Sequence, residues 1–559
     1  MVDRIETGVL IVGAGPVGLT LAMDLAWRGI EVTVAEKRQR GEPPEVKCNH
    51  VAARSMEIFR RLGIVDRVRD AGLPADYPND VAYRTTTTGL ELARIPIPAR
   101  NRRYSATGGP DTWWPTPEPP HRINQIFLEP ILVESAAAMA NIRLINRVEV
   151  TDFTQGDGHV TATARHLGGG TSLSIRAAYM VGCDGGRSGV RKAIGGKLRG
   201  DAVIQRVQST YFRAPALIHL LQAPPAWGTF SLNPRRSGNV YAIDGRETWL
   251  LHNYLKDDEP NFDSVDRDWS IRQILGVGDD FAYEIISNED WYGRRLVVDK
   301  LREGRVFICG DAAHLWVPYA GYGMNAGIAD AENLAWMLAA RLAGWAPASI
   351  LDAHEAERLP ITEQVSRFAM DHAHAMASQR GAVPDRIEEA SAEGRRLRAE
   401  VGRRAYDLNV QQYCAGGLNF GYYYDASPII AYDAGRQPDY TMADFTPSTV
   451  PGCRTPHIWL PDGTSLYDRL GRDFTLLRLD AAVDVAPLIA AAARAGVPLK
   501  VVDVPAGADA AAIYREKLVL SRPDRHVAWR GDAAPVNPAA LVDRIRGAGS
   551  RVRQMEPKM

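Results

Sequence analysis

The sequence predicts a mixed α/β (α+β) fold with several domains, and three observations support this prediction. An apolar run, a glycine-rich turn, a helical pattern and a second apolar run open the chain between residues 8 and 37. Residues 200–295 contain short β-like runs, such as NVYAID and TWLLHNYL, which are typical of an antiparallel sheet. From residue 446 onward, strand and helix patterns alternate again. Since 559 residues exceed one hydrophobic core, we expect about two to four domains.

Composition and charge exclude several classes of function. The net charge of −1 provides no field that would attract nucleic acid or an anionic membrane. The chain contains no run of about 18 apolar residues, and its first apolar run belongs to the glycine motif, so we expect neither a membrane span nor a signal peptide. The five cysteines show no C-x-x-C spacing, which predicts a cytoplasmic location without a disulfide framework. No metal-ligand spacing is evident, so we expect no metal site.

The first element is a glycine-rich turn with the sequence Gly13-Ala14-Gly15-Pro16-Val17-Gly18, which lies between a strand and a helix. Gly13 permits the tight turn, Gly15 lets the backbone approach a pyrophosphate, and Gly18 lets the helix pack closely on the strand. The amides at the helix start and the helix dipole favour negative phosphates. The pattern predicts a Rossmann-like nucleotide site, with a packing turn that binds no ligand as the alternative.

The second strand of this unit ends in an acidic residue. Glu36 lies 18 residues after Gly18, followed by Lys37, and both are candidate cofactor-binding residues. A carboxylate at this position accepts hydrogen bonds from an adenosine ribose and repels a 2′-phosphate. These residues leave NAD and FAD both open.

Two distant stretches favour FAD. In YMVGCDGGRSGVRKAIG, a strand ends before Asp184 and Gly185, and in GRVFICGDAAH a strand ends before Asp311. An acid at the carboxyl end of a strand, beside a glycine turn, is well placed to bond the ribityl hydroxyls of a flavin. Further along, Gly323, Met324 and Asn325 start a helix whose positive end would stabilise negative charge on a reduced flavin.

These motifs, in this order, resemble the single-component FAD-dependent aromatic hydroxylases, the group of p-hydroxybenzoate hydroxylase and phenol hydroxylase. The resemblance covers most of residues 8–370. It implies that Arg54, in RSMEIFRRLG, and Gln125, in RINQIFLEPIL, touch the flavin or its phosphates. The alternatives are a solvated charge at a helix end for Arg54 and a simple helix start for Gln125.

The resemblance also implies a domain order. We expect a Rossmann-like FAD-binding domain from 1–80, 120–200 and 296–370, interleaved with an antiparallel-sheet substrate domain from 81–119 and 201–295. A helical connecting region follows at 371–445. Residues 446–559, which include PGCRTPHIWLPDGTSLYDRLGRDFTLLRL, resemble the thioredoxin-like domain of the phenol hydroxylase branch, without its redox C-x-x-C. Such a domain would act in structure or assembly.

The implied reaction uses NAD(P)H as co-substrate. The absence of a second strand–G-x-G-x-x-G–helix unit implies that the nicotinamide binds transiently, with Arg187 and Arg191 either contacting it or capping backbone carbonyls. In the family, NAD(P)H reduces FAD, and O₂ then forms a flavin C4a-hydroperoxide that hydroxylates a phenolic or polycyclic aromatic ring. The alternatives are epoxidation or Baeyer–Villiger insertion, an FAD-dependent dehydrogenase, and a non-catalytic FAD scaffold. We expect a small aromatic substrate and O₂ as partners, no nucleic acid or membrane, and a homodimer as a candidate assembly.

Candidate catalytic residues come from the central sheet and the flavin-facing turn. His252 and Tyr254 lie two positions apart and therefore share one face of a strand. If that face looks toward the flavin, His252 takes the phenolic proton; the alternative is a histidine of the core or an interface. Pro318 matches the position where relatives place a proline carbonyl beside the flavin. Tyr319 and Tyr322 either line the substrate pocket or wedge the loop.

Substrate anchoring has weaker signals in the sequence. Further pocket candidates are Tyr211 and Tyr241, and His314 is expected to be structural. Residues 205–255 show no basic pattern for a carboxylate, although Arg213, Arg235 and Arg246 are available. We therefore expect a neutral phenolic or polycyclic substrate.

Overall fold

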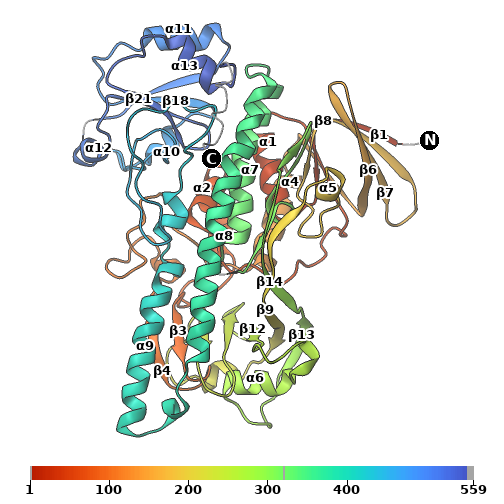
Figure 1. Ribbon diagram of the computed structural model, residues 1–559, viewed down its shortest axis with the longest axis vertical. Coiled ribbons are helices and arrows are strands. Elements are labelled where there is room, and N and C mark those ends of the chain that lie inside the picture. Colours follow the sequence, from red (N-terminus) through yellow and green to blue (C-terminus); the bar gives the residue numbers. More distant parts are fainter. Residues whose placement is uncertain (1–2, 319–320, 506, 550–559) are drawn as a thin grey trace, which may run out of the picture.

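The computed structural model describes residues 3–318, 321–505 and 507–549, which form three β-sheets with their covering helices (Figure 1). The C-terminal sheet and the second sheet lie at opposite ends of the molecule in this view, and the long helix α8 (Asp352–Gly381) runs between them (Figure 1). The described helices are too short or too polar to cross a bilayer.

The first sheet has the order β15-β16-β8-β1-β2-β5, and β6 and β7 extend it beside β8. Its strands are β1 (Asp3–Val12), β2 (Val32–Glu36), β5 (Ile142–Asn146), β6 (Val148–Gly156), β7 (His159–His166), β8 (Ser172–Gly182), β15 (Arg302–Glu303) and β16 (Val306–Ile308). β1 runs parallel to both β2 and β8, and β8 runs parallel to β16. Leu10 and Ile11 are fully buried, as expected for a central parallel strand with both faces covered.

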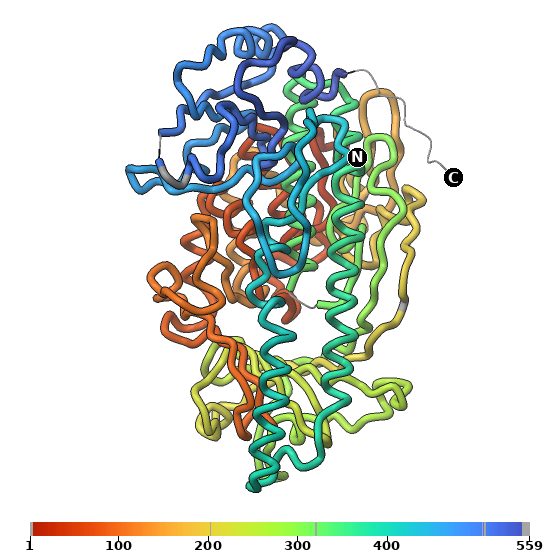
Figure 2. Tube along the Cα trace, turned by 60° about the vertical axis from the view of Figure 1, so that its left-hand side comes forward, coloured from red at the N-terminus to blue at the C-terminus, as the bar shows by residue number. Residues whose placement is uncertain are grey.

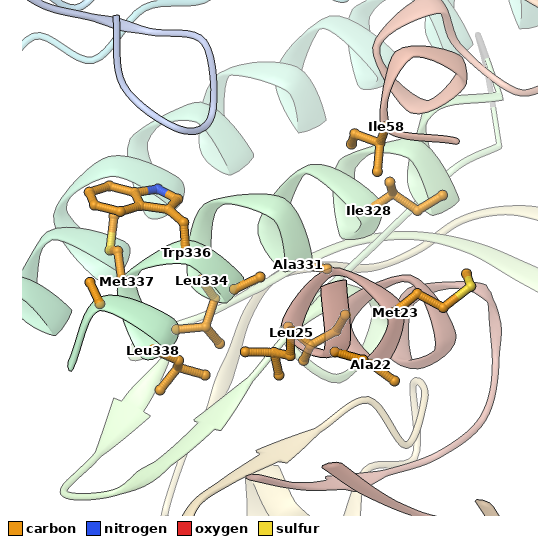
Figure 3. Packing of buried hydrophobic residues seen from close by; sticks show 14 of the residues in the cluster. Ala22, Met23, Leu25, Ile58, Ile328, Ala331, Leu334, Trp336, Met337 and Leu338 are labelled. Atoms are coloured by element: carbon orange, nitrogen blue, oxygen red, sulfur yellow. The ribbon is translucent and has the colours of Figure 1, made fainter. Parts of the chain in front are cut away.

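Helices that pack against one another beside this sheet set the position of the first turn of α7. Helix α1 (Pro16–Trp27) contacts α4 (Gln125–Ala137) and α7 (Tyr322–Leu342). Leu25 of α1 and Leu334 of α7 belong to one buried apolar cluster, which Ile58 joins from α2 (Ala53–Arg61) (Figure 3). Nearly all of α7 is buried, so its first turn has a fixed position at the edge of the sheet.

The second sheet has the order β17-β14-β9-β12-β11-β10-β3-β4, with β13 paired to β9. Its strands are β3 (Val81–Arg84), β4 (Glu91–Ile95), β9 (Leu198–Arg213), β10 (Gly228–Ser231), β11 (Gly238–Ala242), β12 (Thr248–Tyr254), β13 (Glu284–Asn288), β14 (Trp291–Val298) and β17 (His314–Trp316). The pairs are antiparallel except β3 with β10, which is parallel. β17 lies in the segment 296–370 expected in the first domain, yet it pairs with β14, so the chain passes there from one sheet to the other.

Helices cover the second sheet on both faces. Helix α6 (Arg267–Leu275) packs on one face, where a Cβ at Gly238 would lie 2.4 Å from Ile274. Helices α8 and α9 (Ala392–Tyr413) run side by side along the other side of the molecule (Figure 2). Exposed ion pairs, such as Arg396 with Glu400, line the outer face of α9, as the charge-laced sequence predicts.

Residues 110–120 form no helix or strand, which confirms the expectation from their prolines. The shorter helices are α3 (Val65–Asp70) and α5 (Gly189–Ala193).

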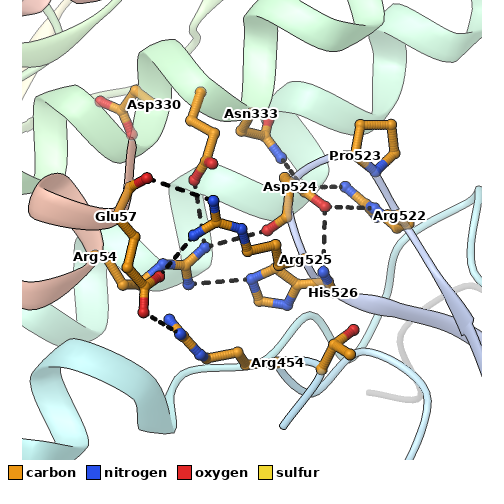
Figure 4. A network of polar contacts seen from close by, with 12 residues as sticks. Arg54, Glu57, Asp330, Asn333, Arg454, Arg522, Pro523, Asp524, Arg525 and His526 are labelled. Atoms are coloured by element: carbon orange, nitrogen blue, oxygen red, sulfur yellow. Dashed lines mark hydrogen bonds and ion pairs between the residues drawn. The ribbon is translucent and has the colours of Figure 1, made fainter. Parts of the chain in front are cut away.

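The C-terminal domain has the thioredoxin-like arrangement that the resemblance implied. Its sheet has the order β19-β18-β20-β21, with β18 (Phe474–Arg478) and β19 (Leu499–Asp503) parallel and β20 (Leu518–Ser521) and β21 (Val527–Gly531) antiparallel. Its helices are α10 (Leu466–Arg469), α11 (Ala486–Arg494), α12 (Ala508–Ile513) and α13 (Pro538–Ile545). Buried ion pairs join this domain to the first one. They include Arg522 with Glu357 and, as Figure 4 shows, Arg525 with Glu57.

Candidate functional site

Three motifs that are far apart in the sequence meet at one edge of the first sheet. β1, β8 and β16 are parallel neighbours, so the turns that follow them start side by side. Gly13 has φ +105°, and a Cβ there would lie 2.4 Å from the carbonyl oxygen of Cys183. A Cβ at Gly310 would lie 3.0 Å from Val17. The glycine motif, the Asp184 turn and the Asp311 turn therefore form one site.

The glycine motif fits a phosphate-bearing cofactor. Gly15 has extended backbone (φ −75°, ψ 178°), and no side chain caps the start of α1, where Pro16 is the first residue. A Cβ at Gly15 would meet no protein atom within 4 Å, whereas one at Gly18 would lie 2.1 Å from the carbonyl oxygen of Gly13. Gly18 thus serves packing, and the backbone at Gly15 stays open to a ligand at the positive end of α1.

Glu36 lies beside this turn, and Lys37 points away from it. The Glu36 carboxylate accepts hydrogen bonds from Ala14 N at 2.6 Å and Arg38 N at 2.8 Å. Lys37 is exposed, and its Nζ lies 2.9 Å from Glu149. The position of Lys37 therefore favours a surface ion pair over contact with a cofactor.

A series of side-chain hydrogen bonds and ion pairs connects Glu36 to Gln125. Arg38 Nη1 lies 2.6 Å from one oxygen of Glu129, and the other oxygen accepts a hydrogen bond from Gln125 Nε2 at 2.9 Å. The backbone N–H of Gln125 also bonds the carbonyl of Cys48 at 3.0 Å. Arg38 and Glu129 were not identified from the sequence, although the position of Arg38, two residues after Glu36, was a signal for it.

Asp311 follows β16 at the same edge of the first sheet. It is exposed, yet the protein atoms crowded around it displace water and raise its pKa, against the opposing charges of His314 and Lys47. Burial and the charge of Asp311 raise the pKa of the Cys48 thiol to about 12. Lys47 and Cys48 therefore lie near Asp311, and Lys47 adds a positive charge that the sequence analysis did not single out.

Asp184 is engaged by its own turn. Its carboxylate accepts hydrogen bonds from Ser188 Oγ at 2.5 Å and Gly189 N at 2.8 Å, which cap α5. Arg191 donates to the carbonyls of Ala312 at 3.0 Å and Gly186 at 3.1 Å, which favours its capping alternative. Arg187 is exposed.

A buried carboxylate that the sequence analysis missed supports the Asp311 turn. Asp330 of α7 accepts hydrogen bonds from Gly310 N at 3.2 Å and Arg358 Nε at 2.8 Å, and it lies 2.8 Å from His314 Nε2. Burial alone would raise the pKa of Asp330, but the charges of Arg358 and His314 outweigh it and lower the pKa. This contact favours the structural role expected for His314.

The start of α7 combines the backbone amides of its first turn with an anchored side chain. Asn325 Oδ1 accepts hydrogen bonds from Ala52 N and Ser55 Oγ, both at 2.8 Å, so its side chain ties α7 to α2. Gly323 and Met324 lie in the first turn of the helix, whose N–H groups have no partner within the helix.

Pro318 is exposed, and its carbonyl accepts a hydrogen bond from Gly321 N at 3.1 Å. Tyr322 is buried and donates to the carbonyl of Leu418, which favours the wedge alternative. Tyr319 lies outside the described residues.

His252 and Tyr254 share the face of the second sheet opposite α6. The His252 ring lies 5.5 Å from the Tyr241 ring and 5.7 Å from the Trp291 ring. Burial lowers the pKa of His252 to about 4, so the imidazole is neutral at neutral pH. Tyr254 accepts a hydrogen bond from Asn239 at 2.7 Å, and the Arg380 guanidinium lies over its ring at 4.2 Å.

Four of the predicted positions, all of them arginines, lie away from this site. Arg54 is buried against the C-terminal domain, where its Nη1 lies 3.2 Å from His526 Nε2 (Figure 4). Its guanidinium also lies over the Tyr422 ring at 4.6 Å. These contacts favour a structural role. The three arginines available to a carboxylate, Arg213, Arg235 and Arg246, are all exposed.

Comparisons with known proteins agree with this geometry. Residues 6–369 match the model described as FAD binding domain, and residues 448–548 match the one described as aromatic-ring hydroxylase, C-terminal. The chain is 29% identical to phenol 2-monooxygenase of Pseudomonas sp. (strain EST1001), covering 97% of this chain and 93% of the relative. It is 30% identical to aklavinone 12-hydroxylase RdmE of Streptomyces purpurascens, covering 97% and 98%.

Solved structures give the same result. The rebeccamycin biosynthetic enzyme RebC with reduced flavin superposes with a TM-score of 0.88 at 35% identity, covering 98% of this chain and 100% of that chain. The family match, which spans more than half of the chain, bears out the resemblance read from the glycine, Asp184 and Asp311 motifs. The chain belongs to the FAD-dependent aromatic hydroxylases, oxidoreductases that use NAD(P)H and O₂ to hydroxylate aromatic substrates.

Proposed function

We propose that this hydroxylase acts on a phenolic ring held between the start of α7 and the His252 face of the second sheet. β17 supports this placement, because it begins three residues after Asp311 and pairs with β14 at the edge of that sheet. The turn for the cofactor and the sheet for the substrate are therefore joined by one short strand. Bound FAD would supply hydride acceptance from NAD(P)H and the activation of O₂.

The residues that would hold FAD lie along the edge of the first sheet. The phosphates would lie at the start of α1, over Gly15, and the adenosine ribose would lie beside Glu36. Asp311 and Gln125 flank the remaining path toward α7. The candidate set is Gly13, Gly15, Pro16, Val17, Gly18, Glu36, Arg38, Lys47, Gln125 and Asp311. The first-turn amides of α7, at Gly323 and Met324, would stabilise negative charge on the flavin pyrimidine edge.

His252 would act as the base for the substrate. A neutral imidazole accepts a proton, and no hydrogen bond to another described residue occupies a ring nitrogen of His252. In the proposed step, the phenol O–H proton moves to a His252 ring nitrogen, and the phenolate oxygen raises the electron density of the aromatic ring. The aromatic neighbours Tyr241 and Trp291 would exclude water from the reacting ring. Pro318 would contribute its carbonyl to the same turn.

The observation that carries this proposal is the open backbone at Gly15, at the meeting point of three strand ends. The test is to purify the protein with FAD and to follow NADH and NADPH oxidation with phenol, 1-naphthol and 6-hydroxy-2-naphthoate under ¹⁸O₂. We expect a yellow protein, faster flavin reduction with an aromatic effector, and one labelled oxygen in a hydroxylated product. Label in an epoxide or ester would indicate the epoxidation or Baeyer–Villiger alternative. Oxidised product without label would indicate a dehydrogenase.

Two further expectations concern the assembly and the cellular location of the protein. A homodimer and a cytoplasmic location remain predictions, which light scattering of the purified protein and fractionation of the producing cells would test.

A further inference from the structure

We propose that Arg122 binds the carboxylate of a multi-ring aromatic substrate, at the end of the site opposite His252. This inference rests on the proposed function, since it names the substrate class of the same site. It also departs from the neutral substrate expected from residues 205–255, because Arg122 lies outside that stretch.

Arg122 is a buried cation without a carboxylate partner. It is 6% exposed, and no Asp or Glu oxygen of the described residues lies within 4.0 Å of its guanidinium. Its Nη1 lies 2.7 Å from Nδ1 of His50, whereas Nε and Nη2 make no hydrogen bond with a described residue. The neighbouring Asp111 is already engaged by Arg103 and by Trp114 Nε1 at 2.8 Å.

Aromatic rings compensate only part of the cost of burying this charge. The guanidinium lies over the Trp227 ring at 4.5 Å and the Tyr413 ring at 5.6 Å. A cation–π contact contributes less free energy than the burial of an unpaired charge costs. Burial accordingly lowers the pKa of Arg122, although a guanidinium stays charged at neutral pH. The site thus lacks an anion, and a substrate group would supply it.

His50 places Arg122 next to the turn that starts α7. The carbonyl of His50 accepts a hydrogen bond from Asn325 Nδ2 at 3.1 Å, and a Cβ at Gly321 would lie 3.0 Å from the His50 Cβ. The residue before Arg122, His121, exchanges backbone hydrogen bonds with Val51, each of 2.9 Å. The side chain of His50 therefore separates Arg122 from the turn where the flavin edge is expected.

A row of aromatic rings leads from Arg122 to His252. Trp227, which lies under Arg122, is 5.2 Å from the Tyr241 ring, and Tyr241 is 5.5 Å from the His252 ring. A substrate along this row would have its hydroxyl at His252 and its anionic group at Arg122. Two rings separate the polar ends of the row, which favours a substrate of at least two fused rings.

The free donors of Arg122 select a carboxylate. Nε and Nη2 lie on one edge of the planar guanidinium, and this edge forms two parallel N–H···O bonds with a carboxylate. A neutral amide offers one acceptor oxygen and no negative charge, so it would leave the cation unpaired. The discrimination would therefore be strong.

The test titrates the FAD-loaded enzyme with 6-hydroxy-2-naphthoate and with 6-hydroxy-2-naphthamide, followed by the change in flavin absorbance. We expect the wild-type protein to bind the carboxylate at least 10-fold more tightly. R122Q, which keeps a donor toward His50, should lose this preference, and R122K should keep part of it. The exposed Arg235→Gln variant is the matched control and should behave like the wild type.

Equal or weaker binding of the carboxylate by the wild type would overturn the inference, as would an unchanged preference in R122Q. FAD content and Tm show whether each variant folds, and the wild-type comparison decides the question if both variants fail. A protein that binds FAD and hydroxylates neutral naphthols without carboxylate preference would contradict only this inference. A protein that never couples NAD(P)H oxidation to aromatic hydroxylation would instead contradict the proposed function.

Discussion

The carboxylate of Glu36 accepts a hydrogen bond from the backbone N–H of Ala14, with 2.6 Å between the two atoms. This contact fastens the end of β2 to the middle of the glycine turn. Glu36 is only 8% exposed, so the acid and the turn form one preorganised unit. A cofactor would meet a turn whose shape is already set.

Replacing Gly15 by valine should abolish FAD binding while leaving the fold intact. The Cβ of the new residue would meet no protein atom within 4 Å, and its methyl groups would occupy the space over the start of α1 that a phosphate needs. We expect FAD content to fall at least 10-fold, measured by absorbance at 450 nm, with the Tm of the apoprotein nearly unchanged. Gly169→Val, whose Cβ also meets no protein atom within 4 Å, is the control that should retain FAD. Full FAD occupancy in G15V would contradict the assigned site.

Asp330→Asn should weaken both the fold and the Asp311 turn. The variant would leave the buried Arg358 guanidinium without its counter-charge, which costs about 3–5 kcal/mol. Since Asp330 also holds Gly310 N, FAD affinity should fall as well. Urea unfolding and FAD titration measure the two effects. Asp352→Asn, which breaks an exposed pair with Arg302, should cost under about 1 kcal/mol. Equal effects of the two variants would refute this role of Asp330.

His252→Phe should slow the hydroxylation of ordinary phenols by about 10²-fold or more, because the base that takes the proton is gone. A nitrophenol that is already ionised at the assay pH should lose much less, since it needs no base. Tyr292→Phe, which changes an exposed ring of the same sheet, is the control with a small expected effect. Steady-state rates with both substrates give the comparison. An equal loss for both substrates would assign His252 to packing.

Arg522→Met should loosen the C-terminal domain. Arg522 is fully buried and pairs with Glu357 of α8 and with Asp524, so its loss leaves two buried carboxylates without a cation. We expect destabilisation of about 3–5 kcal/mol and faster proteolysis between residues 413 and 448. Arg478→Met, in an exposed pair of the same domain, should cost under about 1 kcal/mol. Limited proteolysis with matched thermal scans would detect the difference, and identical digestion of the two variants would contradict it.

The protein should lose stability as the pH falls below about 6.5, before the carboxylates titrate. Seven histidines have pKa values below the ordinary one, mainly because of burial: His50, His121, His252, His354, His372, His457 and His526. The unfolded chain binds protons near pH 6.5, whereas the folded chain resists them until about pH 4, as at His252 and His354. The stability that these histidines contribute is therefore fully present above pH 6.5 and decreases as the pH falls from 6.5 towards 4, by up to about 1.4 kcal/mol per pH unit for a histidine such as His252. A Tm that is equal at pH 7.5 and 5.5 would show that these residues do not control acid stability.

The sequence alone determined the features that depend on local chemistry. Glycine spacing predicted the turn after β1, because Gly13 has a positive φ of +105° and a Cβ at Gly18 would lie 2.1 Å from the carbonyl oxygen of Gly13. Alternation predicted that His252 and Tyr254 share one face, because strand geometry has a period of two. The prolines of 110–120 predicted a segment without regular structure. Each of these inferences needs only neighbouring residues.

Only the tertiary structure decided which charges meet. Arg54 and Arg122 look alike in sequence, yet the fold buries Arg54 against His526 of the C-terminal domain and leaves Arg122 without a carboxylate. Asp330 supports the Asp311 turn because α7 packs beneath it, and β17 joins the second sheet through pairing with β14. Such contacts depend on how helices and sheets dock over long sequence distances. Local propensity carries no information about that docking, since packing and charge pairing are settled only when distant segments meet.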